Sequence, residues 1–367
     1  MSPTIRTAIV GLGNCASSLV QGVAYCRALG DAAIGVPFPV LGGFRPQDVE
    51  IVAAFEVDAR KVGLDISEAI FQAPNCTAIF HREVPPAGVT VQRGPDLDGV
   101  SAFMRNQMAS RSFVPSDEPA LSRQEIVRTL KEREVEVMIN FLPVGSQEAV
   151  EFYASCAIEA GCALVNGIPV LIASDPKWSA KFRAAGVPVL GDDFKAQMGA
   201  TIVHRTLSHL FDMRGVHMDR TYQLNVGGNT DFLNMMDHDR LLTKRLSKTE
   251  AVQTAMVNRL EDQQIRIGPS DYVPWLNDNK IAYVRLEGRL FGGVPMEIEA
   301  RVSVEDSPNA AAMALIAIRL AKIAKDRGLS GDLGSIASFL FKHPPVQVDD
   351  EIGLARMLAF AEGREEA

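Results

Sequence analysis

Hydrophobic and polar positions in the first half of the chain divide it into short apolar runs and longer amphipathic stretches. The apolar runs predict buried strands at residues 5–10, 51–57, 135–141, 163–165 and 187–190. The amphipathic stretches predict helices at about residues 14–26, 123–134, 146–160 and 175–185. Strands that alternate with helices of this length are typical of a parallel sheet with right-handed crossovers. The strands are apolar throughout, as expected when helices cover both faces of the sheet.

The pattern changes in the second half of the chain. Three strands are predicted there, at residues 222–226, 283–286 and 296–304, several with every second position apolar. They favour an antiparallel or mixed sheet. Ser307 and Pro308 then open a long helix, because serine is a good N-cap and proline suits the first helical position. The two halves together predict an α/β protein, in which a Rossmann-type doubly wound parallel sheet is joined to a second α+β domain.

Length, charge and cysteine content narrow the class of protein. A chain of 367 residues favours two domains, since domains usually have about 100–200 residues. The formal net charge of −8 argues against non-specific nucleic-acid binding, which needs a basic face. The five cysteines include no CxxC pair, which fits a reducing compartment. We find no signal peptide, and the longest apolar run, Ala310 to Ile318, is too short to span a bilayer. We expect a cytoplasmic protein without a membrane partner.

A glycine-rich turn follows the first predicted strand and precedes the first helix. Its sequence is GxGxxA, formed by Gly11, Gly13, Asn14, Cys15 and Ala16 with Leu12. In dinucleotide sites the first glycine permits a tight turn, the second lets the backbone approach a pyrophosphate, and the small third residue lets the helix pack closely. The helix N-terminus also offers amides to the phosphates. The motif predicts NAD binding; the alternative is a glycine-rich turn in a fold without a cofactor.

Asp58 ends the second predicted strand, where a dinucleotide fold carries an acid for the ribose. It lies 47 residues after Gly11, against about 20 in the usual motif, and a Gly- and Pro-rich insertion at residues 28–49 accounts for the excess. An acid at this position favours NAD over NADP. Because Arg60 and Lys61 follow, a contact of either residue with a 2′-phosphate is the alternative.

Two further strand ends face the same crevice in this topology. Ligands of open parallel sheets bind beyond the carboxyl ends of the strands. One of these ends includes Pro143 and Gly145, and the other begins at Asn166. Both are candidates for cofactor contacts, and plain connections between strand and helix are the alternative.

Charged residues follow the strand that ends near residue 190. Asp192 and Asp193 precede Lys195 closely, and this set suits a cation or the nicotinamide ribose. The alternative is a helix N-terminus that carries acids for its dipole. A second loop, formed by Gly227, Gly228, Asn229 and Asp231, suits phosphate or sugar hydroxyls, with an ordinary surface turn as the alternative.

Four lysines are candidates for the substrate site. Lys244 and Lys248 are four residues apart and share one face if the segment is helical. Two like charges placed in this way cost energy unless an anion lies between them. Ordinary solvated lysines are the alternative for this pair. Lys280 and Lys342 are isolated in the sequence and indicate nothing by themselves.

Over nearly its whole length the chain resembles the myo-inositol-1-phosphate synthase family, in its compact actinobacterial form. The resemblance rests on GLGNCASS (11–18), GDDFK (191–195), LNVGGN (224–229), LSKT (246–249), GPSDYV (268–273) and EDSPN (305–309). It implies active-site lysines at Lys244, Lys248, Lys280 and Lys342. It implies contacts on the nicotinamide and cation side from Asp192, Lys195 and Asp306. It also implies a phosphate-binding loop at Gly227 to Asn229 with Asp231.

The resemblance further implies how the chain is organised. The NAD-binding domain would comprise residues 1–200 and 308–367, because the C-terminal segment returns to it. Residues 201–307 would form a catalytic domain through whose sheet the protein assembles as a homotetramer. A divalent or monovalent cation would assist catalysis near Asp192 and Asp306.

The reaction that the resemblance implies converts glucose 6-phosphate to 1L-myo-inositol 1-phosphate with no net redox change. NAD takes a hydride from C5, the enolate at C6 attacks C1, and the hydride returns. Lysine ammonium groups suit the negative charge that these steps place on oxygen. Crowding of cations also lowers lysine pKa values, so that a lysine can move a proton. The alternatives are a dehydrogenase that releases NADH and a nucleotide-sensing regulator.

Overall fold

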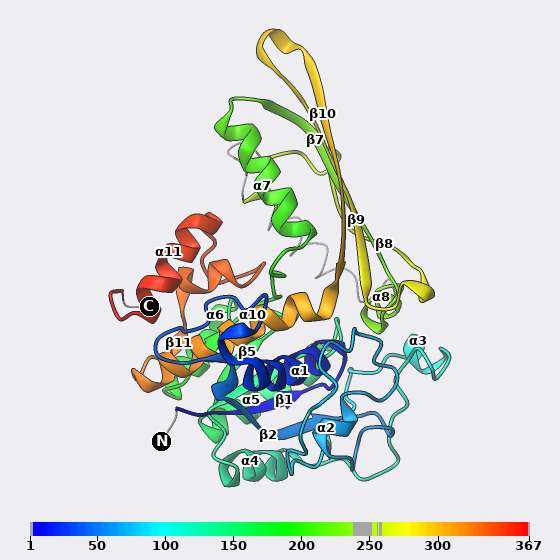
Figure 1. The fold of residues 1–367 in the computed structure, drawn as a ribbon, viewed down its shortest axis with the longest axis vertical. Coiled ribbons are helices and arrows are strands. Elements are labelled where there is room, and N and C mark those ends of the chain that lie inside the picture. Colours follow the sequence, from blue (N-terminus) through cyan, green and yellow to red (C-terminus); the bar gives the residue numbers. More distant parts are fainter. Residues whose placement is uncertain (1–2, 238–251, 255, 257–258, 366–367) are drawn as a thin grey trace.

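The structure is a computed structural model that describes residues 3–237, 252–254, 256 and 259–365. Within these residues it contains two sheets with helices packed around them (Figure 1). The larger sheet is parallel throughout, and its strand order is β11-β6-β5-β4-β1-β2-β3. Its strands are β1 (Ile5–Val10), β2 (Val49–Glu56), β3 (Gln92–Arg93), β4 (Val137–Asn140), β5 (Ala163–Asn166), β6 (Pro188–Leu190) and β11 (Gly331–Asp332).

The strands predicted in the first half of the chain are confirmed, with ends shifted by at most two residues. The strand order reverses between β1 and its neighbours β2 and β4, which is the doubly wound arrangement expected of a Rossmann-type fold. Ligands of such sheets bind at this reversal, beyond the carboxyl ends of the strands. The topology therefore directs attention to the segments that follow β1, β2 and β4.

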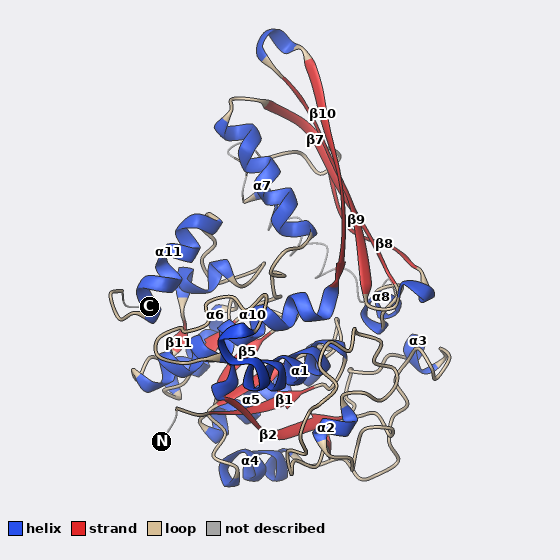
Figure 2. Cartoon of the chain, viewed as in Figure 1, coloured by secondary structure: helices blue, strands red, loops and turns tan. Residues whose placement is uncertain are grey.

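Helices cover both faces of the parallel sheet (Figure 2). One face packs against α1 (Asn14–Leu29) and α10 (Asp306–Asp326). The other packs against α4 (Arg123–Glu132), α5 (Gln147–Ala160) and α6 (Pro176–Ala184). The capping box predicted at the start of α4 is confirmed, because Ser122 and Glu125 exchange hydrogen bonds. Further helices and 3-10 turns are α2 (Ile66–Ala69), α3 (Ala102–Arg105), α8 (Thr230–Asn234), α11 (Asp350–Ala361), η1 (Gly30–Ala32), η2 (Pro46–Asp48), η4 (Pro274–Leu276), η5 (Phe291–Gly293) and η6 (Gly334–Phe339).

The predicted insertion at residues 28–49 is a loop with two short 3-10 turns. It is held against α10 by Arg319, whose side chain is fully buried. The Arg319 guanidinium donates to the carbonyl oxygens of Pro37 and Phe38, at 3.2 Å and 2.6 Å. The insertion is therefore anchored to the core of the first sheet.

The second sheet is mixed, as the sequence predicted. Its strand order is β10-β9-β7-β8, in which only β7 and β8 are parallel. The strands are β7 (His217–Gly227), β8 (Ile265–Tyr272), β9 (Asn279–Arg289) and β10 (Pro295–Glu305). One face packs against α7 (Ala200–Met213), where Phe211 meets Val284 and Leu286. The long β9–β10 hairpin projects away from the parallel sheet (Figure 1).

The start of α10 differs from the prediction. The helix begins at Asp306 and its N-cap is Glu305, so Ser307 is the second helical residue and not the cap. The physical reason is that another side chain takes the place of the cap: Asp278 accepts hydrogen bonds from both the amide and the hydroxyl of Ser307. Pro308 still lies in the first turn, where its missing amide costs nothing. None of the described helices is both long and apolar enough to cross a membrane.

Candidate active site

A cavity lies where the carboxyl ends of β1, β2 and β4 approach the second sheet and the start of α10. The parallel sheet supplies its walls from the glycine-rich turn and from the segments after β2 and β4. The second sheet supplies residues of β7, β9, β10 and the loop before α8. Of the residues predicted for the site, those that line the cavity are Gly11, Gly13, Asn14, Cys15, Pro143, Asp193, Asn229, Asp231, Lys280, Asp306 and Lys342.

The glycine-rich turn is shaped for a close approach by an anion. Gly11 has φ +84°, and a Cβ there would lie 3.0 Å from the carbonyl oxygen of Phe141, so only glycine fits without strain. A Cβ on Gly13 would meet no atom within 4 Å and would extend into open space. Gly13 is the N-cap of α1, and no side chain caps that helix. This turn fits a pyrophosphate, because the helix N-terminus and an open backbone surface face the same cavity.

Buried side chains brace the turn. Lys61 donates to the carbonyl oxygen of Leu12 at 2.7 Å and to Asn75 at 2.9 Å, and burial lowers the pKa of Lys61. Asn14 accepts hydrogen bonds from the amides of Cys76 and Thr77. Ala16 is fully buried against the sheet, as its role in helix packing requires. Lys61 is therefore a support for the turn and does not line the cavity, which removes it as a candidate for a 2′-phosphate.

Cys15 lines the cavity at the start of α1. Its thiol is 3.8 Å from the hydroxyl of Ser307. Burial, together with the carboxylates of Asp278 and Asp306, raises the pKa of Cys15 to about 12. The residue is therefore a neutral thiol at physiological pH and supplies no charge to a cofactor.

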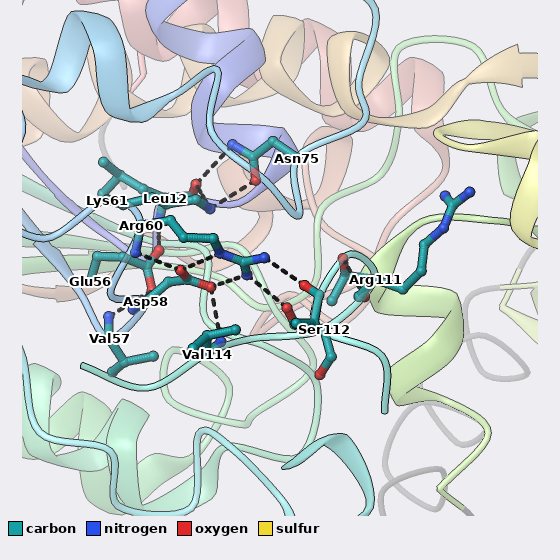
Figure 3. Close-up of polar contacts among 12 residues, drawn as sticks. Leu12, Glu56, Val57, Asp58, Arg60, Lys61, Asn75, Arg111, Ser112 and Val114 are labelled. Carbon is teal, nitrogen blue, oxygen red and sulfur yellow. Dashed lines mark hydrogen bonds and ion pairs between the residues drawn. The ribbon is translucent and has the colours of Figure 1, made fainter. Parts of the chain in front are cut away.

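Asp58 does not lie where the sequence predicted the ribose acid. Its side chain is fully buried and does not line the cavity. Its carboxylate accepts hydrogen bonds from the Arg60 guanidinium and from the amide of Val114 (Figure 3). Arg60 also donates to the carbonyl oxygens of Ala109 and Ser112. The Asp58–Arg60 pair thus fastens the segment at 109–114 to the end of β2, and Arg60 is also removed as a candidate for a 2′-phosphate.

Glu56 is the acid that the structure places at the end of β2. It is the last residue of the strand, lines the cavity and is 8% exposed. Its Oε2 accepts a hydrogen bond from the amide of Leu12, next to Gly11, at 2.6 Å. The sequence analysis missed it because β2 ends two residues before Asp58. The sequence did contain a signal for Glu56, because this residue is also acidic and lies at the same end of the apolar run as Asp58.

Both of the other predicted strand ends contribute to the cavity lining, and the second does so through Gly167, Ile168 and Pro169. Pro143 lines the cavity, whereas Gly145 and Asn166 do not. Asn166 is fully buried; its side chain accepts from Asn140 at 2.8 Å and donates to Asp192 at 2.7 Å. Asn166 therefore connects β4, β5 and the following acidic loop, and its predicted contact with a cofactor stays a prediction.

Asp192 is also turned away from the cavity. Its carboxylate is fully buried and accepts hydrogen bonds from the amides of Ile172, Ala173 and Ser174 and from the hydroxyl of Ser174. Burial raises the pKa of Asp192 despite these donors. The oxygens of Asp192 are committed to the loop at 172–174, so a contact of Asp192 with the nicotinamide or a cation stays a prediction without support from this geometry. Its neighbour Asp193 faces the cavity instead.

Lys195 likewise lies outside the cavity lining. Its fully buried ammonium donates to the carbonyl oxygen of Ser338 at 2.6 Å and to Asp350 at 2.7 Å. Asp350 also accepts from Arg205 of α7 at 2.9 Å. Burial lowers the pKa of Lys195 to about 8. Lys195 therefore ties the acidic loop to the start of α11.

Two of the four predicted lysines meet at the cavity. Lys280 of β9 donates to Asp306 at 2.9 Å, and Lys342 of the C-terminal segment donates to Asp193 at 2.8 Å. These two lysines and their two acidic partners all line the cavity. The other two predicted lysines, at positions 244 and 248, lie outside the described residues. The structure thus brings together a lysine–acid pair from each side of the site.

Acidic neighbours control the charge of Lys280. Burial lowers its pKa, but the attraction of Asp306 and of two further cavity acids, Asp231 and Asp193, outweighs burial and leaves the pKa raised. The sequence analysis expected crowded cations to lower lysine pKa values, and for Lys280 this is wrong. Lys280 is therefore a firmly held positive charge.

The loop after β7 is only partly turned toward the cavity. Asn229 and Asp231 line it, whereas Gly227 and Gly228 do not. A Cβ on Gly228 would lie 2.3 Å from the carbonyl oxygen of Val273, so glycine is needed there for backbone packing. The predicted phosphate loop is therefore represented at the cavity by Asn229 and Asp231.

No group of three or more His, Cys, Asp and Glu side chains forms a metal site within the described parts of the chain. Asp306 and Asp193 face the cavity, and each is paired with a lysine. A cation near Asp306 therefore stays a prediction, with Asp193 in the place expected for Asp192.

Comparisons with known proteins identify the family. Residues 199–307 match the family model of myo-inositol-1-phosphate synthase. The inositol-3-phosphate synthase of Mycolicibacterium smegmatis is 52% identical, over 98% of this chain and 98% of the relative. That of Corynebacterium glutamicum is 48% identical, over 97% of this chain and 98% of the relative.

Solved structures show the same fold. A myo-inositol-1-phosphate synthase-related protein from Thermotoga maritima has a TM-score of 0.77 at 23% identity, covering 99% of this chain and 100% of that one. Inositol-3-phosphate synthase from Caenorhabditis elegans has a TM-score of 0.75 at 16% identity, covering 98% of this chain and 86% of that one. With the near-complete alignment to the actinobacterial enzymes, these findings show that the chain is an enzyme that belongs to the myo-inositol-1-phosphate synthase family.

Proposed function

We propose that the protein converts D-glucose 6-phosphate to 1L-myo-inositol 1-phosphate with bound NAD and without net oxidation. One observation carries this proposal beyond the family relation. Lys280 from the second sheet and Lys342 from the C-terminal segment line the same cavity as the glycine-rich turn. A site that joins a dinucleotide turn to paired ammonium groups suits a reaction that oxidises a sugar phosphate and then stabilises oxyanions.

The chain's own residues suit NAD. The open space at Gly13 and the uncapped start of α1 would receive the pyrophosphate. Glu56 would accept hydrogen bonds from the adenosine ribose, since it is the acid that lines the cavity at the end of β2. Arg60 is committed to Asp58, which supports NAD over NADP. When bound, NAD supplies a hydride acceptor for C5 and later the hydride donor.

Lys280 and Lys342 would stabilise negative charge on substrate oxygens. Asp306 keeps Lys280 protonated, so Lys280 suits charge stabilisation better than proton release. Asp193 accepts a hydrogen bond from Lys342 and so orients its ammonium group. Apolar side chains of β10, Val302 and Val304, line the cavity beside them and exclude water, which strengthens each charge interaction. Lys244 and Lys248, implied by the family resemblance, would complete the set around the substrate.

Further properties belong to the same proposal. We infer a cytoplasmic homotetramer that assembles through the second sheet, and a cation that assists catalysis at Asp306. Light scattering measures the assembly, and activity after removal of divalent and monovalent activators measures the need for a cation. A monomer in solution, or full activity without activators, would contradict the respective statement.

The decisive experiment uses purified protein, glucose 6-phosphate and NAD at a small fraction of the substrate concentration. We expect many turnovers per NAD, a product identified as inositol 1-phosphate by phosphorus NMR and mass spectrometry, and no accumulation of NADH absorbance. Formation of NADH in proportion to the sugar consumed would instead indicate a dehydrogenase. No consumption of glucose 6-phosphate would refute the proposed substrate.

A further inference from the structure

Asp278 is a buried carboxylate that the sequence analysis did not identify. It immediately precedes β9, two residues before Lys280, and is 1% exposed. Its Oδ1 accepts hydrogen bonds from the side-chain amide of Asn229 and from the hydroxyl of Ser307, each at 2.9 Å. Its Oδ2 accepts from the amide of Ser307 at 3.0 Å. Burial raises the pKa of Asp278 to about 6, and the hydroxyl of Thr77 is among the nearby donors that oppose this rise.

The partners of Asp278 belong to three separate parts of the site. Asn229 lines the cavity and caps α8, where its Oδ1 accepts from the amide of Phe232. Ser307 follows Asp306, the partner of Lys280. Thr77 lies 3.0 Å, hydroxyl to hydroxyl, from Ser18 of α1, the helix that begins at the glycine-rich turn. One carboxylate therefore connects the substrate loop, the start of α10 and the cofactor helix.

Main-chain hydrogen bonds reinforce this junction. The carbonyl oxygen of Asp278 accepts from the amide of Asp306 at 3.0 Å. The carbonyl oxygen of the preceding residue, Asn277, accepts from the amide of Gly228 at 3.1 Å. The two residues before β9 thus hold both the loop before α8 and the end of β10.

Asp278 does not line the cavity, so it acts on the reaction only through its neighbours. We propose that Asp278 is a positioning residue, which fixes the Lys280–Asp306 pair and Asn229 relative to the cofactor helix. The inference rests on the proposed function, because the reaction whose rate Asp278 affects is the proposed one. Its physical basis is that a misplacement of about 1 Å in a catalytic group can lower a rate by about 10²-fold.

A carboxylate is needed here because every partner donates. Asparagine at position 278 would keep the shape and one acceptor oxygen, but its amide group would face the donors of Ser307 or Asn229. Such a clash of donors in a buried site costs more than the loss of one hydrogen bond, because a donor is left unsatisfied. We expect the surrounding segments to shift until each donor finds another partner.

The test compares Asp278→Asn with Asp271→Asn, an exposed acid of β8 in the same sheet. For Asp278→Asn we expect kcat to fall by about ten- to a hundredfold and the KM for glucose 6-phosphate to rise, while the dissociation constant for NAD stays within about threefold. The purely structural alternative predicts that activity falls only with the folded fraction. Circular dichroism and thermal unfolding of the same samples measure that fraction.

A second variant covers a failure of Asp278→Asn to fold. Thr77→Val removes the connection to Ser18 and α1 with little change in side-chain shape, and we expect it to lower kcat with Asp278 intact. Kinetics of either folded variant within twofold of the wild-type protein would overturn the inference. The wild-type protein and Asp271→Asn report the proposed function: if neither acts on glucose 6-phosphate, the proposed function fails. If both act and Asp278→Asn matches them, only the role of Asp278 fails.

Discussion

Lys280 and Asp306 lie 26 positions apart in the chain, yet their side-chain nitrogen and oxygen are 2.9 Å apart. The antiparallel pairing of β9 with β10 places Lys280 opposite Val304, and Asp306 follows directly after β10. The pair therefore forms at the junction of the second sheet with α10. It joins the strand that carries the lysine to the helix that packs on the parallel sheet.

Replacement of a cavity lysine should affect turnover far more than folding. For Lys280→Ala and Lys342→Ala we expect kcat to fall by about 10²–10³-fold, because each removes a donor to a developing oxyanion. Steady-state kinetics and thermal unfolding measure the two effects. Lys177→Ala, at an exposed position of α6, is the control and should behave as the wild-type protein. A lysine variant with turnover within threefold of this control would exclude that lysine from catalysis.

The two glycines of the turn should respond differently to alanine. Gly13→Ala places a methyl group in open space, so the protein should fold normally but bind NAD at least tenfold more weakly, since the methyl group lies where the pyrophosphate would approach. Gly11→Ala strains a positive φ and crowds Phe141, so it should lower stability as well. Calorimetric titration with NAD and thermal unfolding separate the cases. Unchanged NAD affinity in Gly13→Ala would place the pyrophosphate elsewhere.

Variants at Glu56 and Asp58 should have different effects, the first on NAD binding and the second on stability. Glu56→Gln should weaken NAD binding, because a ribose hydroxyl loses a charged acceptor. Asp58→Asn should lower the free energy of unfolding by about 1–3 kcal/mol, since it leaves the partly buried Arg60 without its charged partner. NAD titration and urea unfolding of both variants give the comparison. The opposite result, with NAD affinity lost in Asp58→Asn alone, would restore Asp58 as the ribose acid.

The free energy of unfolding should fall as the pH is lowered from 7 to 5 because of His204. This side chain is fully buried between α7 and β7, where it contacts the hydroxyl of Thr221 at 2.7 Å, and burial lowers the pKa of His204 to about 4. In the unfolded chain the group takes up a proton near pH 6.5, so the unfolded state binds more protons between these values. The contribution of His204 amounts to about 2 kcal/mol of lost stability at pH 5.

Urea unfolding at pH 7 and pH 5 measures this loss. His204→Gln should be less stable at pH 7, but its stability should change less between the two pH values. His209→Gln, on the same helix at a half-buried position, should keep the wild-type difference. An equal pH dependence in the wild-type protein and His204→Gln would assign the acid sensitivity to other groups.

The sequence predicted the parallel sheet well because its strands are buried on both faces and read as plain apolar runs, as β1 and β5 illustrate. Side-chain direction at the strand ends was harder to predict. Asp192 and Asp193 are adjacent acids, and only the hydrogen bonds from residues 172–174 decide which of them faces the cavity. Glu56 and Asp58 presented the same difficulty, because local patterns do not reveal that Arg60 engages the second acid.

Long-range partners account for the remaining differences. Ser307 has the local pattern of an N-cap, but Asp278, 29 positions away, supplies the acceptor for its amide. The motif of Lys195 predicted a contact on the nicotinamide side, yet its ammonium group donates to Asp350 and to the carbonyl oxygen of Ser338, more than 140 positions along the chain. Such pairings depend on how the segments fold together, which no local spacing encodes.

Because β10 passes directly into α10, the end of the strand determines how the helix is rotated about its own axis. The strand ends at Glu305 and the helix begins at Asp306, with no linker residue between them. Each residue turns an α-helix by about 100°, so one inserted or deleted residue here would swing the whole apolar face of α10 away from α1. The number of residues at this junction is therefore as much a part of the site as any side chain, because it determines which face of α10 packs on the parallel sheet.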